Sequence, residues 1–261
     1  MIPEPYAFLG VRVGAYTIDD LNAAIAGAVA SGGRIVIANH NMRSVGLARR
    51  DPAMRAFYDS ADVVHVDGMP LIPLGRMLGA PLTRAHRVTY VDWVPALIAE
   101  AARRGWRVFG LGGRPGVGER AAERLRAVHP TLVIETAHGY FDQRAGSDEG
   151  RAVLAAIARF APHVLLVGLG MPQQERWVHA HRGAIAANAT LMAGAALDYV
   201  AGVVPTPPRW AGRWSLEWAF RLAAEPRRLG RRYLVEPWPV LGLFVREWTA
   251  RATRGTGGVH R

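Results

Sequence analysis

Residues 163–175 are HVLLVGLGMPQQE, and this stretch sets the architecture expected for the whole chain. Its apolar half is continuous rather than alternating, which is typical of a parallel strand buried on both faces. Glycines and a proline then end the strand, and the polar residues that follow begin a helix. A buried strand, a glycine turn and a helix together form the unit from which α/β proteins are built.

The same unit recurs on both sides of this stretch. Short apolar runs predict strands over residues 34–39, 62–67, 107–112, 131–137, 163–168 and 189–193. Helical patterns lie between them, over residues 18–30, 52–60, 91–104, 115–128, 148–160 and 173–181. This alternation predicts an α/β fold with a Rossmann-like, mostly parallel sheet of about six strands flanked by helices.

The pattern changes after Gly202. Residues 203–210, VVPTPPRW, hold three prolines and can continue neither a helix nor a central strand. Helical patterns follow over about 213–234, interrupted at Pro226, and over 240–251. We therefore expect an α/β domain over residues 1–204, a C-terminal helical appendage over 205–251 and a disordered tail over 252–261.

The composition excludes several classes of protein. Half of the 261 residues are apolar and there is no cysteine, which excludes a disordered chain, a disulfide scaffold, a cysteine-based zinc site and a thiol nucleophile. The start, MIPEPYAFLG, lacks the features of a secretory signal, and the apolar run of the tail is far too short to span a bilayer. A cytoplasmic location is expected, with peripheral attachment to a membrane left open.

The charge is concentrated near the C-terminus. All 32 basic residues are arginines, set against 21 acids, for a net charge of +11. Residues 203–261 hold eleven of the arginines, only four acids and five of the eight tryptophans. Such a tail favours an anionic partner, which can be a membrane surface, a nucleic acid or a phosphorylated substrate.

Candidate chemistry lies where the predicted strands end, because ligands of open α/β sheets bind at the carboxyl ends of the strands. Asp67 is the best candidate for a general base. It ends a buried strand beside Gly68, and partial desolvation would raise the pKa of its carboxyl toward a useful value. Asp-Gly is also a common turn pair, and that alternative stays open.

Two glycine-rich motifs end other strands. GLGGRPGVG, residues 110–118, resembles a phosphate-cradling loop and places Gly112 and Gly113 near the positive end of a helix. It departs from the dinucleotide fingerprint at Pro115, although Glu135 falls where a ribose-binding acid could sit. A tight turn without a ligand is the alternative. In the second motif, Gln174 and Glu175 begin a helix, where they can bind the polar edge of a base or sugar or can cap the helix.

The remaining signals concern metals and the tail. The nine histidines show no metal-binding spacing, so no metal and no cofactor are expected. In the tail, like charges four residues apart, such as Arg227 with Arg231 and Arg228 with Arg232, repel by a few tenths of a kcal/mol. An anion would offset this repulsion, and tryptophan with arginine suits a membrane interface. A solvated basic face is the alternative.

Five stretches together resemble the WecG/TagA/CpsF family of bacterial glycosyltransferases over about residues 30–235. They are ADVVHVDGMP (61–70), RVFGLGGRPGV (107–117), HGYF (138–141), VGLGMPQQERW (167–177) and LEWAFRLAAEPRRLGRRYL (216–234). The last is the most specific, because its arginines, tryptophan and proline recur at the family's spacing.

The resemblance implies an inverting, metal-independent transfer from a UDP-sugar donor, often UDP-N-acetylmannosamine. The acceptor is a sugar on a polyprenyl diphosphate at the inner face of the cell membrane, and the products feed teichoic acid linkage units, capsule and exopolysaccharide. Nucleic acid is not an expected partner. The family's base falls on Asp67. Its substrate-binding positions fall on Asn41, Arg87, Gln174 and Asp198, with Asn39, Gly112, Gly113 and Glu175 beside them and Arg221, Arg228 and Arg231 near the diphosphate.

The sequence departs from the family pattern where substrate would be bound. Asn39 replaces the usual threonine, Gln173 replaces a lysine, and Tyr90 replaces a glycine that commonly follows the Arg87 segment. The sugar is therefore not fixed by the resemblance. Two other functions stay open: an NAD(P)-dependent oxidoreductase, which Pro115 opposes, and a basic module that binds membrane or nucleic acid. A homo-oligomer formed through the tryptophan-rich appendage also stays open.

Overall fold

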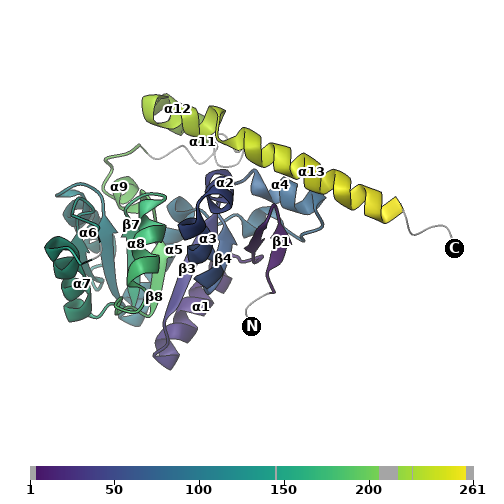
Figure 1. Cartoon of the computed structure of the whole chain (residues 1–261). Coiled ribbons are helices and arrows are strands. Elements are labelled where there is room, and N and C mark those ends of the chain that lie inside the picture. Colours follow the sequence, from purple (N-terminus) through teal and green to yellow (C-terminus); the bar gives the residue numbers. More distant parts are fainter. Residues whose placement is uncertain (1–3, 145, 206–216, 225, 257–261) are drawn as a thin grey trace.

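Six parallel strands form the centre of the fold, as the computed structural model of the chain shows (Figure 1). The structure describes residues 4–144, 146–205, 217–224 and 226–256. The strands lie in the order β4-β3-β8-β7-β5-β6, and every neighbouring pair is parallel. Their bounds are β3 (Ile35–His40), β4 (Val63–Val66), β5 (Arg107–Gly112), β6 (Val133–Ala137), β7 (Val164–Gly168) and β8 (Ala189–Met192). The predicted fold class and all six predicted strands are confirmed.

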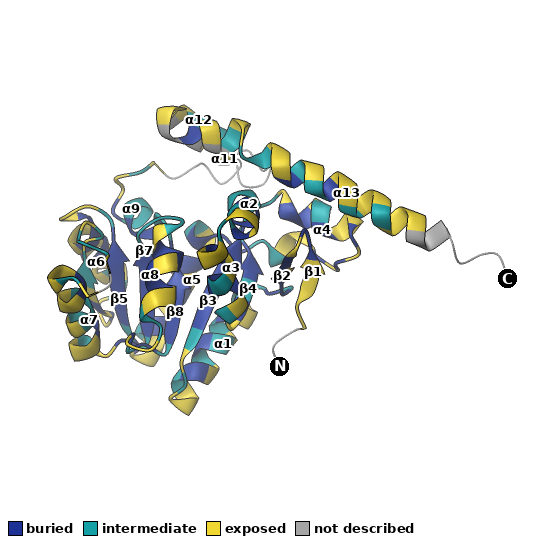
Figure 2. Cartoon of the chain, viewed as in Figure 1, coloured by how far each residue is buried: buried dark blue, intermediate teal, exposed yellow. Residues whose placement is uncertain are grey.

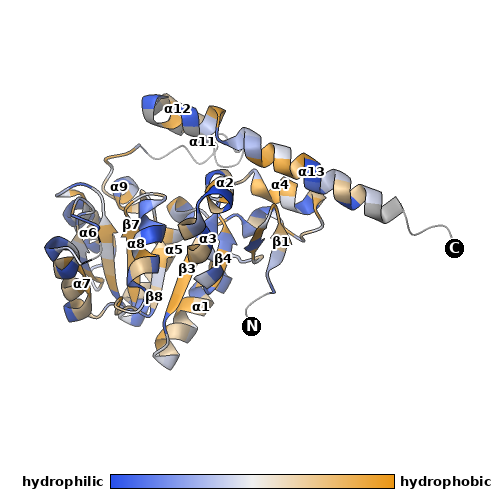
Figure 3. Ribbon diagram, viewed as in Figure 1, coloured by the Kyte–Doolittle hydropathy of each residue, from blue (hydrophilic) through white to orange (hydrophobic). Residues whose placement is uncertain are grey.

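Both faces of this sheet are covered by helices. One face carries α1 (Ile18–Ser31), α5 (Tyr90–Arg104) and α6 (Val117–Val128). The other carries α2 (Met42–Arg50), α3 (Pro52–Ser60), α7 (Asp148–Phe160) and α8 (Gln173–His181). Strand β7 explains the continuous apolar run, because Leu165 and Val167 enter one core while Val164 and Leu166 enter the other. Figure 2 shows the central strands β3, β8 and β7 largely buried, and Figure 3 shows these strands as mostly apolar.

Several short elements carry no pattern that predicts them. Strands β1 (Tyr6–Phe8) and β2 (Val11–Val13) form an antiparallel hairpin of three residues each, closed by a turn in which Leu9 and Gly10 both have positive φ. Helices α2, α4 (Leu71–Met77) and α9 (Ala196–Val200) are also absent from the prediction. Helices α4 and α9 have seven and five residues, too few to establish a helical period of apolar residues.

The C-terminal segment forms α11 (Glu217–Ala224), α12 (Pro226–Leu234) and α13 (Pro237–Thr256). Helix α13 packs along α2 and buries Val240 and Phe244 in the core shared with α2, α3 and α8. Its other anchors are ionic and polar: Arg43 pairs with Glu236 at 3.5 Å, and the Leu9 amide donates to Glu247 at 2.7 Å. This half of the predicted appendage therefore shares a hydrophobic core with the α/β body.

One predicted boundary lies outside the described residues, and another differs from the structure. The long tail helix, predicted from about residue 213, is described only from Glu217, because residues 206–216 lie outside the described part. The tail predicted to be disordered from residue 252 is helical through Thr256, and 257–261 lie outside the described part. In this helical stretch the Thr253 hydroxyl donates to the Thr249 and Ala250 carbonyls, one turn earlier. No apolar period in the sequence predicts the helix here.

Candidate active site

The carboxyl edge of the sheet contains a topological switch point. From β5 the chain moves to β6 on one side, whereas from β7 it moves to β8 on the other. A crevice for ligands forms where neighbouring strands diverge in this way. Here that place lies between the ends of β5 and β7, where Gly112 pairs with Gly168.

Four glycines line this edge, and we call them the glycine row: Gly139, Gly112, Gly168 and Gly194. A Cβ atom at Gly112 would lie 2.5 Å from the Gly168 oxygen, and one at Gly168 would lie 2.5 Å from the Gly194 oxygen. A Cβ at Gly139 would lie 3.2 Å from the Gly112 Cα. The row is thus backbone packed on backbone, which lets a ligand approach the main chain closely.

The loop after β5 brings Asp198 to the glycine row. Gly113 has φ +72°, and its carbonyl accepts a hydrogen bond from the Gly139 amide at 2.9 Å. The Asp198 carboxylate, on α9, lies 3.8 Å from the position of a Cβ at Gly113. The structure therefore brings the predicted residues Gly112, Gly113 and Asp198 together at the carboxyl ends of β5 and β7.

Asp67 and Asn41 meet at the other end of the same edge. The Asn41 Nδ2 donates to Asp67 Oδ2 at 3.4 Å, while its Oδ1 accepts from the Ser44 amide and caps α2. The Asp67 amide donates to the His40 carbonyl, which extends the ladder between β3 and β4 by one residue. A Cβ at Gly68 would lie 3.1 Å from Asn41 Cβ, so glycine is the residue that permits this approach.

Arg87 lies beside the same strand end. Its backbone forms a parallel bridge with Val66, and the next amide, of Val88, donates to the Val66 carbonyl at 2.8 Å. The side chain is 11% exposed, and its guanidinium lies 3.9 Å from Asp92. Arg87 thus lies beside the end of β4, and its role in binding substrate stays a prediction.

A wall of buried polar rings backs this half of the site, and the sequence did not single it out. His40 stacks on Tyr58 with ring centroids 3.9 Å apart, and its Nδ1 lies 2.9 Å from Ser44 Oγ. The Tyr58 hydroxyl donates to the Asn39 carbonyl at 3.1 Å. Asn39 Oδ1 is itself buried and has no hydrogen-bond partner among the described residues. In the sequence, the only signal of this wall is that polar residues stand at the ends of the apolar runs.

Burial sets the protonation of these rings. It lowers the pKa of His40 to about 3 and that of His65 to about 4, so both are neutral at physiological pH. Burial also raises the pKa of the Tyr58 and Tyr90 hydroxyls well above 10. The negative charges of Asp67 and Glu175 add to this rise at both tyrosines, which keeps them as neutral hydroxyls.

Gln174 and Glu175 turn inward. Gln174 Nε2 donates to Glu175 Oε1 at 2.9 Å, and Gln174 Oε1 accepts from the Gly194 amide at 3.2 Å. Gln174 is 3% exposed and Glu175 is completely buried. The pair therefore ties the start of α8 to the end of β8 and fixes one member of the glycine row.

Comparison with known proteins identifies the family. Residues 6–254 match the model described as the Glycosyl transferase WecG/TagA/CpsF family. The chain belongs to this family. It is 30% identical over 212 residues to the N-acetylglucosaminyldiphosphoundecaprenol N-acetyl-beta-D-mannosaminyltransferase of Bacillus spizizenii (strain ATCC 23059 / NRRL B-14472 / W23), covering 81% of this chain and 79% of that protein. It is 27% identical over 197 residues to the protein of the same name from Staphylococcus aureus (strain MRSA252), covering 76% and 75%.

Membership of this glycosyltransferase family bears on the open alternatives. The chain is a hexosyltransferase. The position of Glu135 also opposes a dinucleotide site, because this residue is exposed in the middle of β6 opposite Phe109, whereas a ribose-binding acid would lie at the carboxyl edge. Among the tail arginines predicted to bind diphosphate, Arg231 is exposed on α12, whereas the side chains of Arg221 and Arg228 lie outside the described part. Their roles stay predictions.

Two further observations cover the described residues alone. They contain no group of three or more histidine, aspartate or glutamate side chains placed to hold a metal ion. None of the helices within them combines the length and the apolar content needed to cross a bilayer.

Proposed function

We propose that this glycosyltransferase moves a hexose, N-acetylmannosamine or a close relative, from a UDP-sugar to a saccharide on a polyprenyl diphosphate. The reaction would take place at the inner face of the cell membrane and feed a cell-surface polysaccharide. The names of the two relatives support both the transferred sugar and the lipid-linked acceptor. The observation that carries the proposal is the Asn41–Asp67 pair, which shares one edge of the sheet with the glycine row.

The order of the strands suggests how the donor lies. The ends of β4 and β5 are four strand intervals apart, so Asp67 and Gly112 are separated by roughly 19 Å along the edge. We place the nucleoside of the donor at Gly112 and Gly113, which lets its diphosphate extend along the edge past the ends of β7 and β8. The anomeric carbon, one oxygen away from the diphosphate, then lies near the end of β3, where an acceptor hydroxyl can reach both this carbon and Asp67, and Asp198 and Asn39 lie along the donor.

Asp67 would act as the general base of a single displacement. It takes the proton of the acceptor hydroxyl while that oxygen bonds to the anomeric carbon, on the face opposite the diphosphate. The bond from the anomeric carbon to the diphosphate oxygen breaks, and UDP leaves with the electron pair. General-base assistance of this kind is worth roughly 10²–10⁴-fold in rate.

Neighbouring groups would prepare this carboxylate for its role. Asn41 orients the carboxylate through its amide, and the N-terminal end of α2 stabilises its negative charge. Arg87, beside it, and Arg221, Arg228 and Arg231 in the appendage would offset the charge that develops on the diphosphate. Gln174 and Glu175 would act as positioning residues through Gly194.

A transfer assay tests the proposal. The purified chain is incubated with UDP-N-acetylmannosamine and N-acetylglucosamine on a polyprenyl diphosphate, with chelator present, and the disaccharide-lipid and UDP are quantified. We expect product with inversion at the anomeric carbon. UDP-N-acetylglucosamine and UDP-glucose serve as matched donors, and preferential use of either would reassign the sugar. Reduction of NAD(P) by the protein, with no transfer from any donor, would overturn the proposal.

A further inference from the structure

The first turn of α5 contains a carboxylate that the proposed mechanism does not use. Helix α5 begins after Thr89, whose hydroxyl accepts from the Asp92 amide at 3.4 Å and so caps the helix. The Asp92 side chain points toward the candidate site, because its Oδ2 lies 3.9 Å from Nη1 of Arg87. Arg87 in turn bridges Val66 at the end of β4. Asp92 therefore contacts a residue of the candidate site from just outside it.

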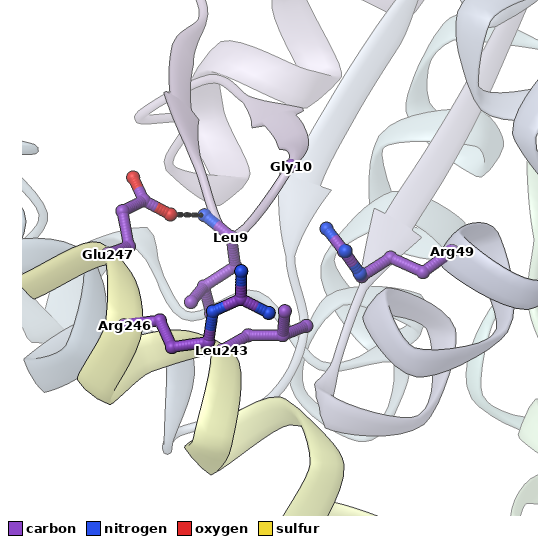
Figure 4. A pocket seen from close by; sticks show the side chains of 6 residues that line it. All are labelled: Leu9, Gly10, Arg49, Leu243, Arg246 and Glu247. Atoms are coloured by element: carbon purple, nitrogen blue, oxygen red, sulfur yellow. Dashed lines mark hydrogen bonds between the residues drawn. The ribbon is translucent and has the colours of Figure 1, made fainter. Parts of the chain in front are cut away.

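Two carboxylates elsewhere in the chain show what such a group does when it only fastens the backbone. Helix α1 begins with the same Thr-x-x-Asp pattern as α5. There Asp20 Oδ2 accepts from the Thr17 amide at 2.9 Å and from the Thr17 hydroxyl at 2.7 Å, which completes a capping box. Glu247 likewise accepts from a backbone amide, that of Leu9, as the dashed line in Figure 4 shows.

The Asp92 carboxylate is oriented differently from that of Asp20. Its Oδ2 accepts from the Thr89 hydroxyl at 2.8 Å, but within the described part of the chain it accepts nothing from the Thr89 amide, so α5 lacks the capping box of α1. The oxygen that the hydroxyl holds is the same one that faces Arg87. The Thr89 hydroxyl therefore fixes the carboxylate in the orientation that pairs with the guanidinium.

The burial of the two side chains explains which of them gains from the contact. Arg87 is 11% exposed, whereas Asp92 is 55% exposed. A guanidinium that is largely removed from water is stabilised by a carboxylate beside it. An arginine side chain also has many rotamers, and a charged partner favours the few that keep the guanidinium near it. Pairing with Asp92 therefore helps to hold the Arg87 guanidinium beside the end of β4.

We propose that Asp92 is a positioning residue, which holds the Arg87 guanidinium at the carboxyl edge of the sheet and itself touches no substrate. This role rests on the proposed function, in which Arg87 offsets the charge that develops on the diphosphate. Since that charge develops only as UDP leaves, a misplaced guanidinium slows the transfer step more than it weakens donor binding. Loss of the Asp92 charge should therefore lower kcat and leave the donor KM nearly unchanged.

A double-mutant cycle with the full chain tests the proposal. Asp92→Asn keeps the size of the side chain and an oxygen for the Thr89 hydroxyl, and it leaves the Asp92 amide to the cap. Ion pairs with a half-exposed partner are weak, so kcat should fall roughly two- to fivefold. In the Arg87→Gln background the same substitution should change kcat by less than about 1.5-fold, because no guanidinium is left to position. Asp20→Asn is the matched control and should keep the wild-type kcat and donor KM, since the Asp20 carboxylate bonds to its own cap.

Three outcomes would overturn the proposal. Equal losses of kcat in both backgrounds would show an effect of Asp92 that does not pass through Arg87. A raised donor KM with normal kcat would place Asp92 in contact with the donor. A wild-type kcat for Asp92→Asn, beside a slow Arg87→Gln, would overturn the positioning role and leave the proposed function standing.

The proposed function can fail separately, if the wild-type protein transfers no sugar. The same cycle, read in the midpoint of urea unfolding, then still tests the pair. Shifts of the midpoint that are not additive would support the contact between Asp92 and Arg87, and additive shifts would overturn it.

Discussion

The glycine row should tolerate no side chain at its centre, and Gly168→Ala is the sharpest perturbation of it. The added Cβ would lie 2.5 Å from the Gly194 carbonyl oxygen, in a region where ordinary contacts begin at 3.4 Å. The obstacle is backbone, so no side-chain rotation can relieve it, and β7 and β8 must separate at their carboxyl ends. Overpacking of this kind costs about 1–3 kcal/mol, and we expect the upper half of that range.

Urea and thermal unfolding measure the change in stability. In a domain of this size, about 2–3 kcal/mol corresponds to a fall in Tm of roughly 5–10 °C. The donor KM should also rise, because the proposed donor lies against these displaced strand ends. Gly27→Ala is the matched control: this exposed glycine of α1 has nothing within 4 Å of the new Cβ, so alanine should stabilise the protein by about 0.5–1 kcal/mol. Unchanged stability and unchanged donor KM in Gly168→Ala would refute the reasoning.

Three further predictions concern the surroundings of the site. Asn41→Ala should lose about 1 kcal/mol of stability as the α2 cap is removed, and kcat should fall as well because Asp67 loses its partner; a variant with normal kcat would limit Asn41 to capping. His65 has a folded-state pKa of about 4, below its ordinary 6.5, so its share of stability is complete above pH 6.5 and is lost as the pH falls toward 4. Acid unfolding curves of His65→Phe should therefore be flatter by up to about 1.4 kcal/mol per pH unit, and an unchanged slope would exclude His65 as the cause. Asp51→Ala should lower the free energy of unfolding in urea by about 1–2 kcal/mol, because Asp51 Oδ1 caps α3 and Asp51 Oδ2 pairs with Arg176 at 2.6 Å. Arg176→Ala should cost less, because it leaves the cap intact.

The elements that the sequence predicts well are those with a strong local pattern. The buried run of β7 and the helix from Gln173 to His181 appear in the structure as predicted, because each carries its period in a few adjacent residues. The meeting of Asn41 and Asp67 follows from a rule of parallel sheets, since the two residues end neighbouring strands. The glycine motif after β5 ends its strand as predicted, but its place at the switch point follows from the strand order, which only the structure gives.

What the sequence could not predict depends on contacts between distant segments. The Leu9 amide and the Glu247 carboxylate are 238 residues apart, so nothing local indicates that α13 packs on the hairpin. The inward turn of Gln174 depends on Gly194, whose amide reaches Gln174 Oε1 only when β8 lies beside β7. The sequence of Gln174 and Glu175 suits both capping of a helix and binding of substrate. Only the structure shows that both side chains are buried.

The central claim is that Asp67 is the base, and Asp67→Asn tests it most directly. The amide keeps the size of the side chain but takes no proton, so kcat at saturating donor and acceptor should fall roughly 10²–10⁴-fold. Donor affinity, measured by calorimetry with UDP, should change little, and Asp59→Asn, an exposed acid on α3, should keep full turnover. An Asp67→Asn protein that turns over at the wild-type rate would contradict the account.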